Sequence, residues 1–113
     1  LMDGSANPYL MQAGIIAAGL DGIQNNRKPG KPVFLNMYEE SHKLKNVKKL
    51  PLSLPESLDL LKNSSVLNKA FGKEIIQSYL TLRNRELENY RQLEGSIKTD
   101  TVTKWEKDNT LDC

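Results

Sequence analysis

The residues that decide the fold are 7–23, NPYLMQAGIIAAGLDGI. They predict a helix with Asn7 as its N-cap and Pro8 at its first position, where the missing N–H costs nothing. Apolar side chains recur along one stripe at alternating steps of four and three residues, and more apolar residues occupy the other faces. Such a helix has to be covered on every side, and the remaining ~90 residues are too few to wrap it. We therefore expect it to lie inside a larger protein.

The rest of the chain predicts shorter helices joined by loops. Ser53 and Glu56 fit a capping box that opens one helix. Ser64 or Ser65 caps the next, which Gly72 ends in a left-handed conformation. No stretch alternates as a strand would. The predicted fold is all-α, with about four to five helices and long loops. Its segments are a buried helix in 1–24, a loop in 25–52, two short helices in 53–72, a long helix in 73–95 and a tail helix in 96–113.

The long helix has one apolar side that a single cation interrupts. Arg83 falls on this side, and a buried unpaired charge is too costly, so its guanidinium is expected to reach a carboxylate. Glu86, one turn further on, is the nearest partner. The apolar residues of this side are Ile76, Tyr79, Leu80, Leu87, Tyr90 and Leu93.

The composition excludes several classes of partner and site. The 16 basic and 14 acidic side chains give a net charge of +2, too near balance for a phosphate-binding surface, so nucleic acid is not an expected partner. The uncharged stretch 4–20 contains polar residues and is short for a bilayer span of about 20 apolar residues, so no membrane is expected. The only cysteine, Cys113, and the only histidine, His42, exclude an internal disulfide and a His-rich metal site. This cysteine usage suits a reducing, cytoplasmic location.

None of the common catalytic motifs occurs in the sequence. There is no phosphate loop, no H-E-x-x-H, no C-x-x-C and no G-x-S-x-G. Glu39 and Glu40 form a carboxylate pair, but they precede a lysine-rich segment and are expected to be solvated. Leu1 begins the chain without an initiator methionine or a signal peptide, so we expect the chain to be excised from something longer. The residues alone indicate a helical piece that needs a larger partner.

Three motifs follow one another in order: ANPYL at 6–10, AAGLDGI at 17–23 and PG at 29–30. Together they resemble the signature that follows the last catalytic strand in type I glutamine synthetases. The resemblance continues more loosely through NMYE at 36–39 and through Y-x-x-x-R-x-x-E at 79–86. It implies that residues 1–113 are a C-terminal fragment of a glutamine synthetase or a related γ-glutamyl-amine ligase, namely the C-terminal helical part of the catalytic domain.

The resemblance implies an enzyme that activates the γ-carboxylate of glutamate with ATP, as γ-glutamyl phosphate, and then captures ammonia to give glutamine. Magnesium or manganese ions assist. In the family the metal-binding Glu and phosphate-binding Arg precede the Asn-Pro-Tyr motif, so no catalytic, cofactor-binding or metal-binding residue is assigned here. The fragment alone is expected to be inactive. Its expected partners are the remainder of the same polypeptide and further copies, since the family forms a homo-oligomer of stacked hexameric rings.

One residue matches a regulatory position of the family. Tyr38, in Asn-Met-Tyr-Glu, resembles the tyrosine that is adenylylated in some bacterial enzymes. Met37 stands where those enzymes usually have Leu, and the Leu-Pro-Pro-like stretch that normally follows is replaced by Glu40-Ser41-His42. The other interpretation is a plain loop tyrosine.

The tail is expected to be a last helix, capped by Thr99 or Asp100, that contains Val102 and Trp105. Its V-T-x-W-E pattern resembles relatives that join glutamate to other amines, so methylamine or a polyamine is an alternative to ammonia. The C-terminal segment helps to hold the rings together in the family, which makes Trp105 a candidate oligomer contact. A Trp that simply docks the last helix is the other interpretation.

A free-standing helical interaction module remains as an alternative from a different class. The intact mass of the native gene product would separate it from a ligase. Because the family resemblance depends on a helix made for burial, an ordered helix over 8–23 with bare flanks would count against the ligase.

Overall fold

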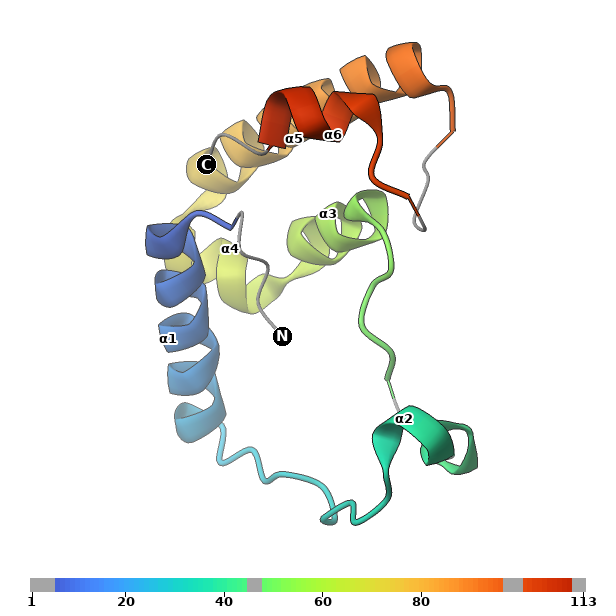
Figure 1. The fold of residues 1–113 in the computed structure, drawn as a ribbon. Coiled ribbons are helices and arrows are strands. Elements are labelled where there is room, and N and C mark those ends of the chain that lie inside the picture. The colour runs from blue at the N-terminus through green and yellow to red at the C-terminus, as the bar shows by residue number, and fades with distance from the viewer. Residues whose placement is uncertain (1–5, 45–47, 97–100, 111–113) are drawn as a thin grey trace.

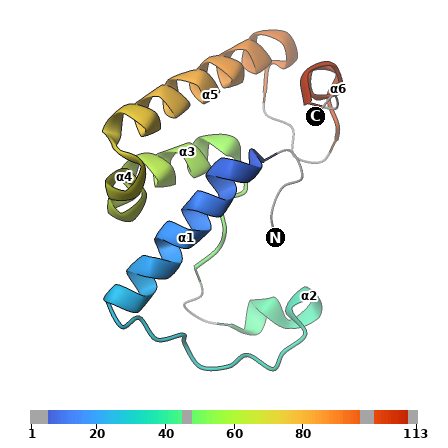
Figure 2. The same ribbon diagram turned by 90° about the vertical axis from the view of Figure 1, so that its left-hand side faces the viewer.

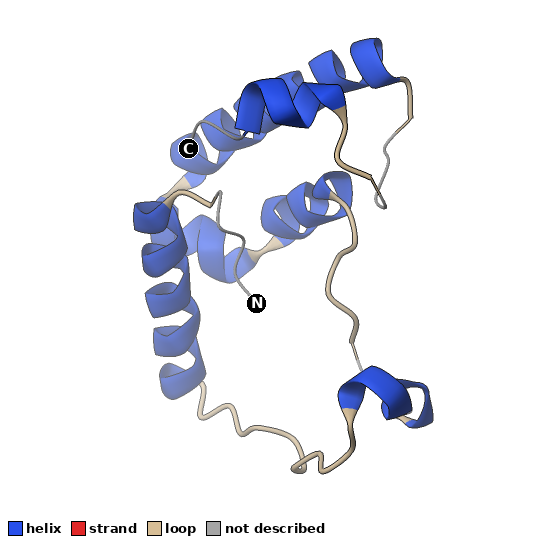
Figure 3. Cartoon of the chain, in the orientation of Figure 1, coloured by secondary structure: helices blue, strands red, loops and turns tan. Residues whose placement is uncertain are grey.

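The structure is a computed structural model that describes residues 6–44, 48–96 and 101–110. Within those ranges it contains helices and no strand, which confirms the predicted all-α fold (Figure 3). The elements in chain order are α1 (Pro8–Gln24), α2 (Met37–Glu40), the 3-10 helix η1 (Ser41–Lys43), α3 (Leu54–Asn63), α4 (Ser65–Phe71), α5 (Lys73–Glu94) and α6 (Lys104–Thr110).

The helices form an open arrangement (Figure 1). α3, α4 and α5 pack on one another, α1 packs beside α4, and α6 packs on α5. Figure 2 shows that long loops carry α2 away from these helices. The radius of gyration is 16.8 Å, whereas a compact domain of this size has about 13 Å. The described chain therefore encloses little interior.

Side-chain caps and two glycines, Gly72 and Gly95, set several of the helix ends. Asn7 Oδ1 accepts the N–H groups of Tyr9 at 3.0 Å and Leu10 at 3.1 Å, which confirms the predicted N-cap of α1. Ser64 Oγ accepts the N–H of Leu67 at 3.3 Å, so Ser64 caps α4 rather than Ser65. Gly72, at φ 84°, ends α4 as predicted, in a conformation that costs a glycine little.

The prediction of a capping box at the start of α3 is wrong. The Ser53 side chain makes no capping hydrogen bond. The carboxylate of Glu56 reaches back one residue further than expected and accepts the N–H of Leu52 at 2.9 Å. Glu56 thus still satisfies a free N–H at the start of the helix, where a carboxylate is also favoured by the helix dipole.

The segment predicted as a loop, residues 25–52, contains two short helical turns, α2 and η1. Asn36 Oδ1 accepts the N–H of Tyr38 at 3.1 Å and caps α2. Acidic residues in the first turn, Glu39 and Glu40, favour the same turn through the helix dipole. These local interactions favour a short helix here. The sequence prediction missed it because the segment lacks the apolar periodicity that marks a longer helix.

The core is small and lies between α3 and α5. Leu58 of α3 is buried against Ile76 and Leu80 of α5. Leu61, Phe71 and Tyr79 pack around these three side chains. Further along α5, Leu87 and Tyr90 are also buried. Leu93 was predicted on this face but is exposed, because it lies six residues after Leu87 and therefore about 120° around the helix from it.

Helix α1 has no buried residue within this chain, so its predicted burial is not seen. Its main neighbour is α4, a helix of seven residues. One short helix cannot cover a helix of 17 residues that is apolar on all faces. The apolar faces of α1 are therefore exposed in this chain. Such exposure is the condition stated above as evidence against the ligase family.

We predict that Leu80→Ala lowers the free energy of unfolding by about 2–4 kcal/mol, because it leaves a cavity in the core between α3 and α5. Leu82→Ala is the matched control on the same helix. Leu80 is 6 % exposed and Leu82 is 54 % exposed, so the control should cost less than about 1 kcal/mol. Urea unfolding followed by circular dichroism measures both. Equal losses in the two variants would contradict the position of the core.

Candidate functional site

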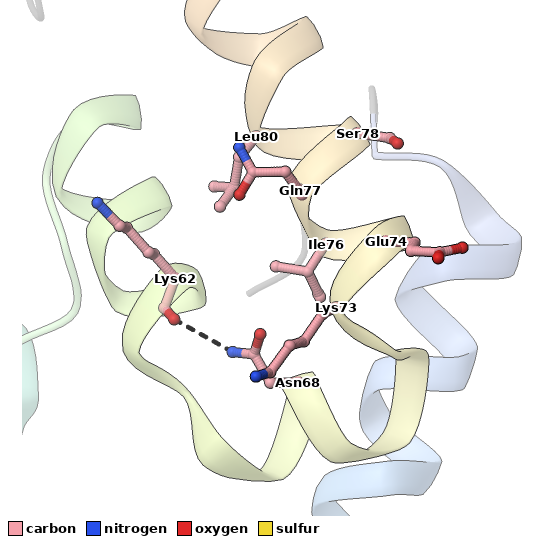
Figure 4. Close-up of a pocket in the computed structure, with 8 residues that line it drawn as sticks. All are labelled: Lys62, Asn68, Lys73, Glu74, Ile76, Gln77, Ser78 and Leu80. Atoms are coloured by element: carbon pink, nitrogen blue, oxygen red, sulfur yellow. Dashed lines mark hydrogen bonds between the residues drawn. The ribbon is translucent and has the colours of Figure 1, made fainter.

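A hollow of about 660 Å³ opens beside the first turns of α5 (Figure 4). Asn68, in its wall, donates from Nδ2 to the carbonyl oxygens of Ser64 at 2.7 Å, Lys62 at 3.1 Å and Leu61 at 3.3 Å. The amide is therefore used to cap the end of α3, a role that the sequence analysis did not assign to it. The hollow is lined by Lys62, Asn68, Lys73, Glu74, Ile76, Gln77, Ser78 and Leu80.

The described residues offer no metal centre. Among residues 6–44, 48–96 and 101–110, no three His, Cys, Asp or Glu side chains come together as a metal ion would need. Glu39 is exposed, and the carboxylate of Glu40 contacts Lys43 Nζ. His42 is exposed in η1. Cys113 lies outside the described residues.

Arg83 makes the ion pair that the sequence predicted. Its Nη1 donates to Glu86 Oε2 at 2.6 Å, and its guanidinium lies 5.3 Å from the centre of the Tyr79 ring. Burial acts to lower the pKa of Arg83, but hydrogen bonds and charge from Glu86 and Tyr79 outweigh it, so the pKa is raised above its ordinary value. Both partners are about one-third exposed, so the pair stabilises by no more than about 1 kcal/mol.

Tyr38 is the most accessible aromatic side chain described. It is 97 % exposed and lies in the first turn of α2, which Asn36 caps. A loop leads into α2, and η1 follows it directly (Figure 1). A phenol held on a short exposed turn is accessible to a modifying enzyme.

Trp105 packs within the chain against α5. Its ring meets the ring of Tyr90 edge to face, with centroids 5.5 Å apart and planes at 81°. Its backbone N–H donates to Glu94 Oε1 at 3.1 Å. Trp105 is partly buried in this position.

The tail helix is shorter than predicted. α6 begins at Lys104, so Val102 lies outside it. Thr103 starts the helix: its hydroxyl and its N–H both donate to Glu106 Oε2, and its Oγ1 accepts the N–H of Glu106. The T-x-x-E signal of this capping box was present in the sequence and was missed. Thr99 and Asp100, the predicted caps, lie outside the described residues.

The remaining feature is the bare surface of α1. Its exposed apolar side chains include Tyr9, Ile16, Leu20 and Ile23, which we call the α1 stripe. α1 contains three glycines, Gly14, Gly19 and Gly22. A Cβ added at any of them would meet no neighbouring element within 4 Å. Another element could therefore approach the backbone of this helix closely. No helix in the described part of the chain is long and apolar enough to cross a membrane.

The comparisons with known proteins agree on one family. A family model described as the glutamine synthetase catalytic domain matches residues 1–107. Glutamine synthetase of Rhizobium leguminosarum bv. phaseoli is 40 % identical over 112 residues, which are 99 % of this chain and 24 % of the relative. Glutamine synthetase of Methanococcus maripaludis is 34 % identical over 107 residues, 92 % of this chain and 22 % of the relative.

A solved structure gives the same result at the level of the fold. The structure of the GmaS/ADP complex in its conformation 1 superposes with a TM-score of 0.76 at 36 % identity. It covers 100 % of this chain, and the chain covers 24 % of it. The chain thus spans about a quarter of the length of the proteins it matches. Because the family model covers nearly all of the sequence, this chain belongs to the glutamine synthetase family and falls within its catalytic domain.

Proposed function

We propose that residues 1–113 act as the C-terminal helical part of a glutamine synthetase, which in its intact form makes glutamine from glutamate and ammonia with ATP through γ-glutamyl phosphate. Their role is to support the catalytic sheet by packing against it and to help assemble the oligomer. The observation that carries this proposal is the match of residues 1–107 to the glutamine synthetase catalytic domain, in a chain that spans about a quarter of a much longer relative.

The energetics of α1 favour such a role. Fully burying one Leu or Ile side chain gains about 1.5–3 kcal/mol relative to leaving it exposed. Ile16, Leu20 and Ile23 are all more than half exposed here, so covering them would contribute several kcal/mol by the same measure. In the relatives, the matched stretch is 24 % of the protein, and a helix like α1 has far more chain available to cover it. Its exposure in this chain is therefore compatible with the family.

We propose that the described residues do not themselves form a site for ATP or for magnesium or manganese. They contain no cluster of three metal-binding side chains, and the Arg83 guanidinium already pairs with Glu86 and stacks on Tyr79. Neutralising a transferring phosphoryl group needs cations that are directed at it. We therefore assign no chemical step to these residues, and we propose that ATP and metal ions bind elsewhere in the intact enzyme and that this chain alone is inactive.

Methylamine or a polyamine is an alternative to ammonia as the amine that accepts the γ-glutamyl group. The tail pattern around Trp105 resembles relatives that join glutamate to methylamine or a polyamine, and the solved structure that superposes on the chain is GmaS rather than a protein named glutamine synthetase. The curated relatives at 40 % and 34 % identity are named glutamine synthetases. We keep ammonia as the proposed substrate and a γ-glutamyl-amine ligase as the second candidate.

We further propose a cytoplasmic homo-oligomer of stacked rings, with Trp105 as a candidate contact between copies. Tyr38 is the proposed site of adenylylation, and its exposed phenol supports this. Trp105 already packs on Tyr90 of its own chain, so a contact with another copy would use the part of the indole that remains exposed.

We predict that the 113-residue chain by itself binds a hydrophobic dye or self-associates, because an exposed apolar surface of this size is rarely left in water. Ile16→Lys should reduce dye binding or association about twofold or more by placing a charge in the α1 stripe. Ile75→Lys is the matched control, since Ile75 is an exposed isoleucine on α5. Sedimentation and dye fluorescence measure the effect. A folded monomer that binds no dye would contradict the proposal.

We predict that the chain alone forms no product from glutamate, ATP and ammonia, whereas the intact protein does. Mass spectrometry of the products with ammonia, methylamine and a polyamine, each supplied separately, identifies the amine. A clear preference for methylamine or the polyamine would favour the second candidate. Product formed by the chain alone would contradict the assignment of a supporting role.

We predict that an adenylyltransferase modifies the intact protein at Tyr38 and that Tyr38→Phe abolishes the added mass, because the substitution removes the acceptor hydroxyl. Tyr79→Phe is the matched control, because it removes a phenol hydroxyl from a partly buried tyrosine of α5 and should leave the modification unchanged. Peptide mass spectrometry after incubation with ATP gives the result. Modification that persists in Tyr38→Phe would exclude this tyrosine.

A further inference from the structure

α1 contains a single charged side chain, Asp21, and this residue lies in the last turn of the helix. The C-terminal end of a helix carries partial negative charge, so a carboxylate there is disfavoured by its own helix. The rest of α1 is apolar or uncharged, and an unpaired charge on such a helix would be costly to cover. The carboxylate of Asp21 therefore needs compensation from outside the helix.

The residues that directly follow α1 supply this compensation. Arg27 Nε donates to Asp21 Oδ2 at 2.7 Å, and Asn25 Nδ2 donates to Asp21 Oδ1 at 2.8 Å, so both carboxylate oxygens are used. Arg27 also brings a positive charge to the end of the helix, where the helix dipole favours it. The side chain of Arg27 is 63 % exposed and that of Asp21 is 23 % exposed. Water screens such a pair in part, so its main effect is on geometry rather than on global stability.

The backbone between Asp21 and Arg27 makes one sharp reversal. The N–H of Arg27 donates to the carbonyl oxygen of Gly22 at 2.9 Å, and the N–H of Asn26 donates to that of Ile23 at 3.1 Å. This pair of hydrogen bonds is the Schellman ending of a helix. Asn26 has φ 49°, a left-handed conformation that asparagine adopts less readily than the glycine usually found there. The contacts of Asp21 thus support a reversal that the backbone at Asn26 holds less firmly.

From this geometry we infer that Asp21 and Arg27 form a clasp that keeps the reversal at 25–27 closed and fixes the direction in which the chain leaves α1. Asp21 is a positioning residue that acts through Arg27 and Asn25. The chain runs from this reversal into the long loop that leads to α2 (Figure 1). With the clasp open, Asn26 can leave the left-handed conformation, and the loop can leave α1 in more than one direction. This inference does not rest on the proposed enzymatic activity.

Hydrogen exchange of the intact native protein, followed by mass spectrometry, tests the clasp. Asp21→Ala removes both side-chain contacts and should lower the protection of the amides of 25–27 about fivefold, the effect of losing one ordinary hydrogen bond. Arg27→Ala should have a similar effect. The double variant should be no less protected than Asp21→Ala alone, because two partners in one contact do not act additively. The amides around Leu80, in the core, should keep their protection.

Asp59→Ala is the matched control, because Asp59 is an exposed aspartate on another helix, α3. It should leave the protection of 25–27 unchanged. An effect of Asp21→Ala that is no greater than that of Asp59→Ala would overturn the inference. Losses from Asp21→Ala and Arg27→Ala that multiply in full in the double variant would overturn it too, since the two residues would then act independently.

Trypsin gives a second measurement on the same variants. Lys28 and Lys31 each precede a proline, and trypsin does not cleave such bonds, so the bond after Arg27 is its cleavage site within residues 25–36. Asp21→Ala keeps this site and should speed cleavage there about fivefold, because cleavage follows the population of the open form. Cleavage at the same rate in Asp21→Ala and Asp59→Ala would contradict the clasp.

Discussion

The packing of α3 against α5 is the interaction on which the rest of the described structure depends. Leu58 meets Ile76 and Leu80 there, and these are three of the five apolar side chains that are buried among the described residues. α4 is held between the two helices by Gly72 and by the amide of Asn68, which ties α4 to the end of α3. α1 then packs on α4, and α6 packs on the far part of α5. A change in this α3–α5 seam would therefore shift α4, and with it α1, and would also shift α6.

The same seam is too small to account for the whole chain. α1 brings more apolar surface than these helices can cover, and its residues remain exposed. Membership of the glutamine synthetase family explains the imbalance, since the chain spans about a quarter of the length of its relatives. An apolar helix with free approach to its glycines is suited to packing inside a larger domain. We therefore regard the α1 stripe as the principal functional surface of these residues.

Much of the local structure was predictable. The span of α5, the Asn7 cap, the Gly72 terminus and the pairing of Arg83 with Glu86 all follow from residues within a few positions of one another. The failures have specific causes. Ser53 was expected to cap α3, but the outcome depended on how the preceding chain approaches the helix. Leu93 was assigned to the buried face of α5, but at 3.6 residues per turn it lies about 120° around the helix from Leu87 and is exposed.

The sequence by itself determined the helical class, most helix ends and the family, because capping, apolar periodicity and ordered motifs are properties of neighbouring residues. It also indicated that α1 is unsuited to water. Only the tertiary structure decided that Asn68 caps α3, that Glu94 holds the start of α6 and that Trp105 rests on Tyr90. These contacts join different helices, and the path of the chain between those helices decides which side chains meet.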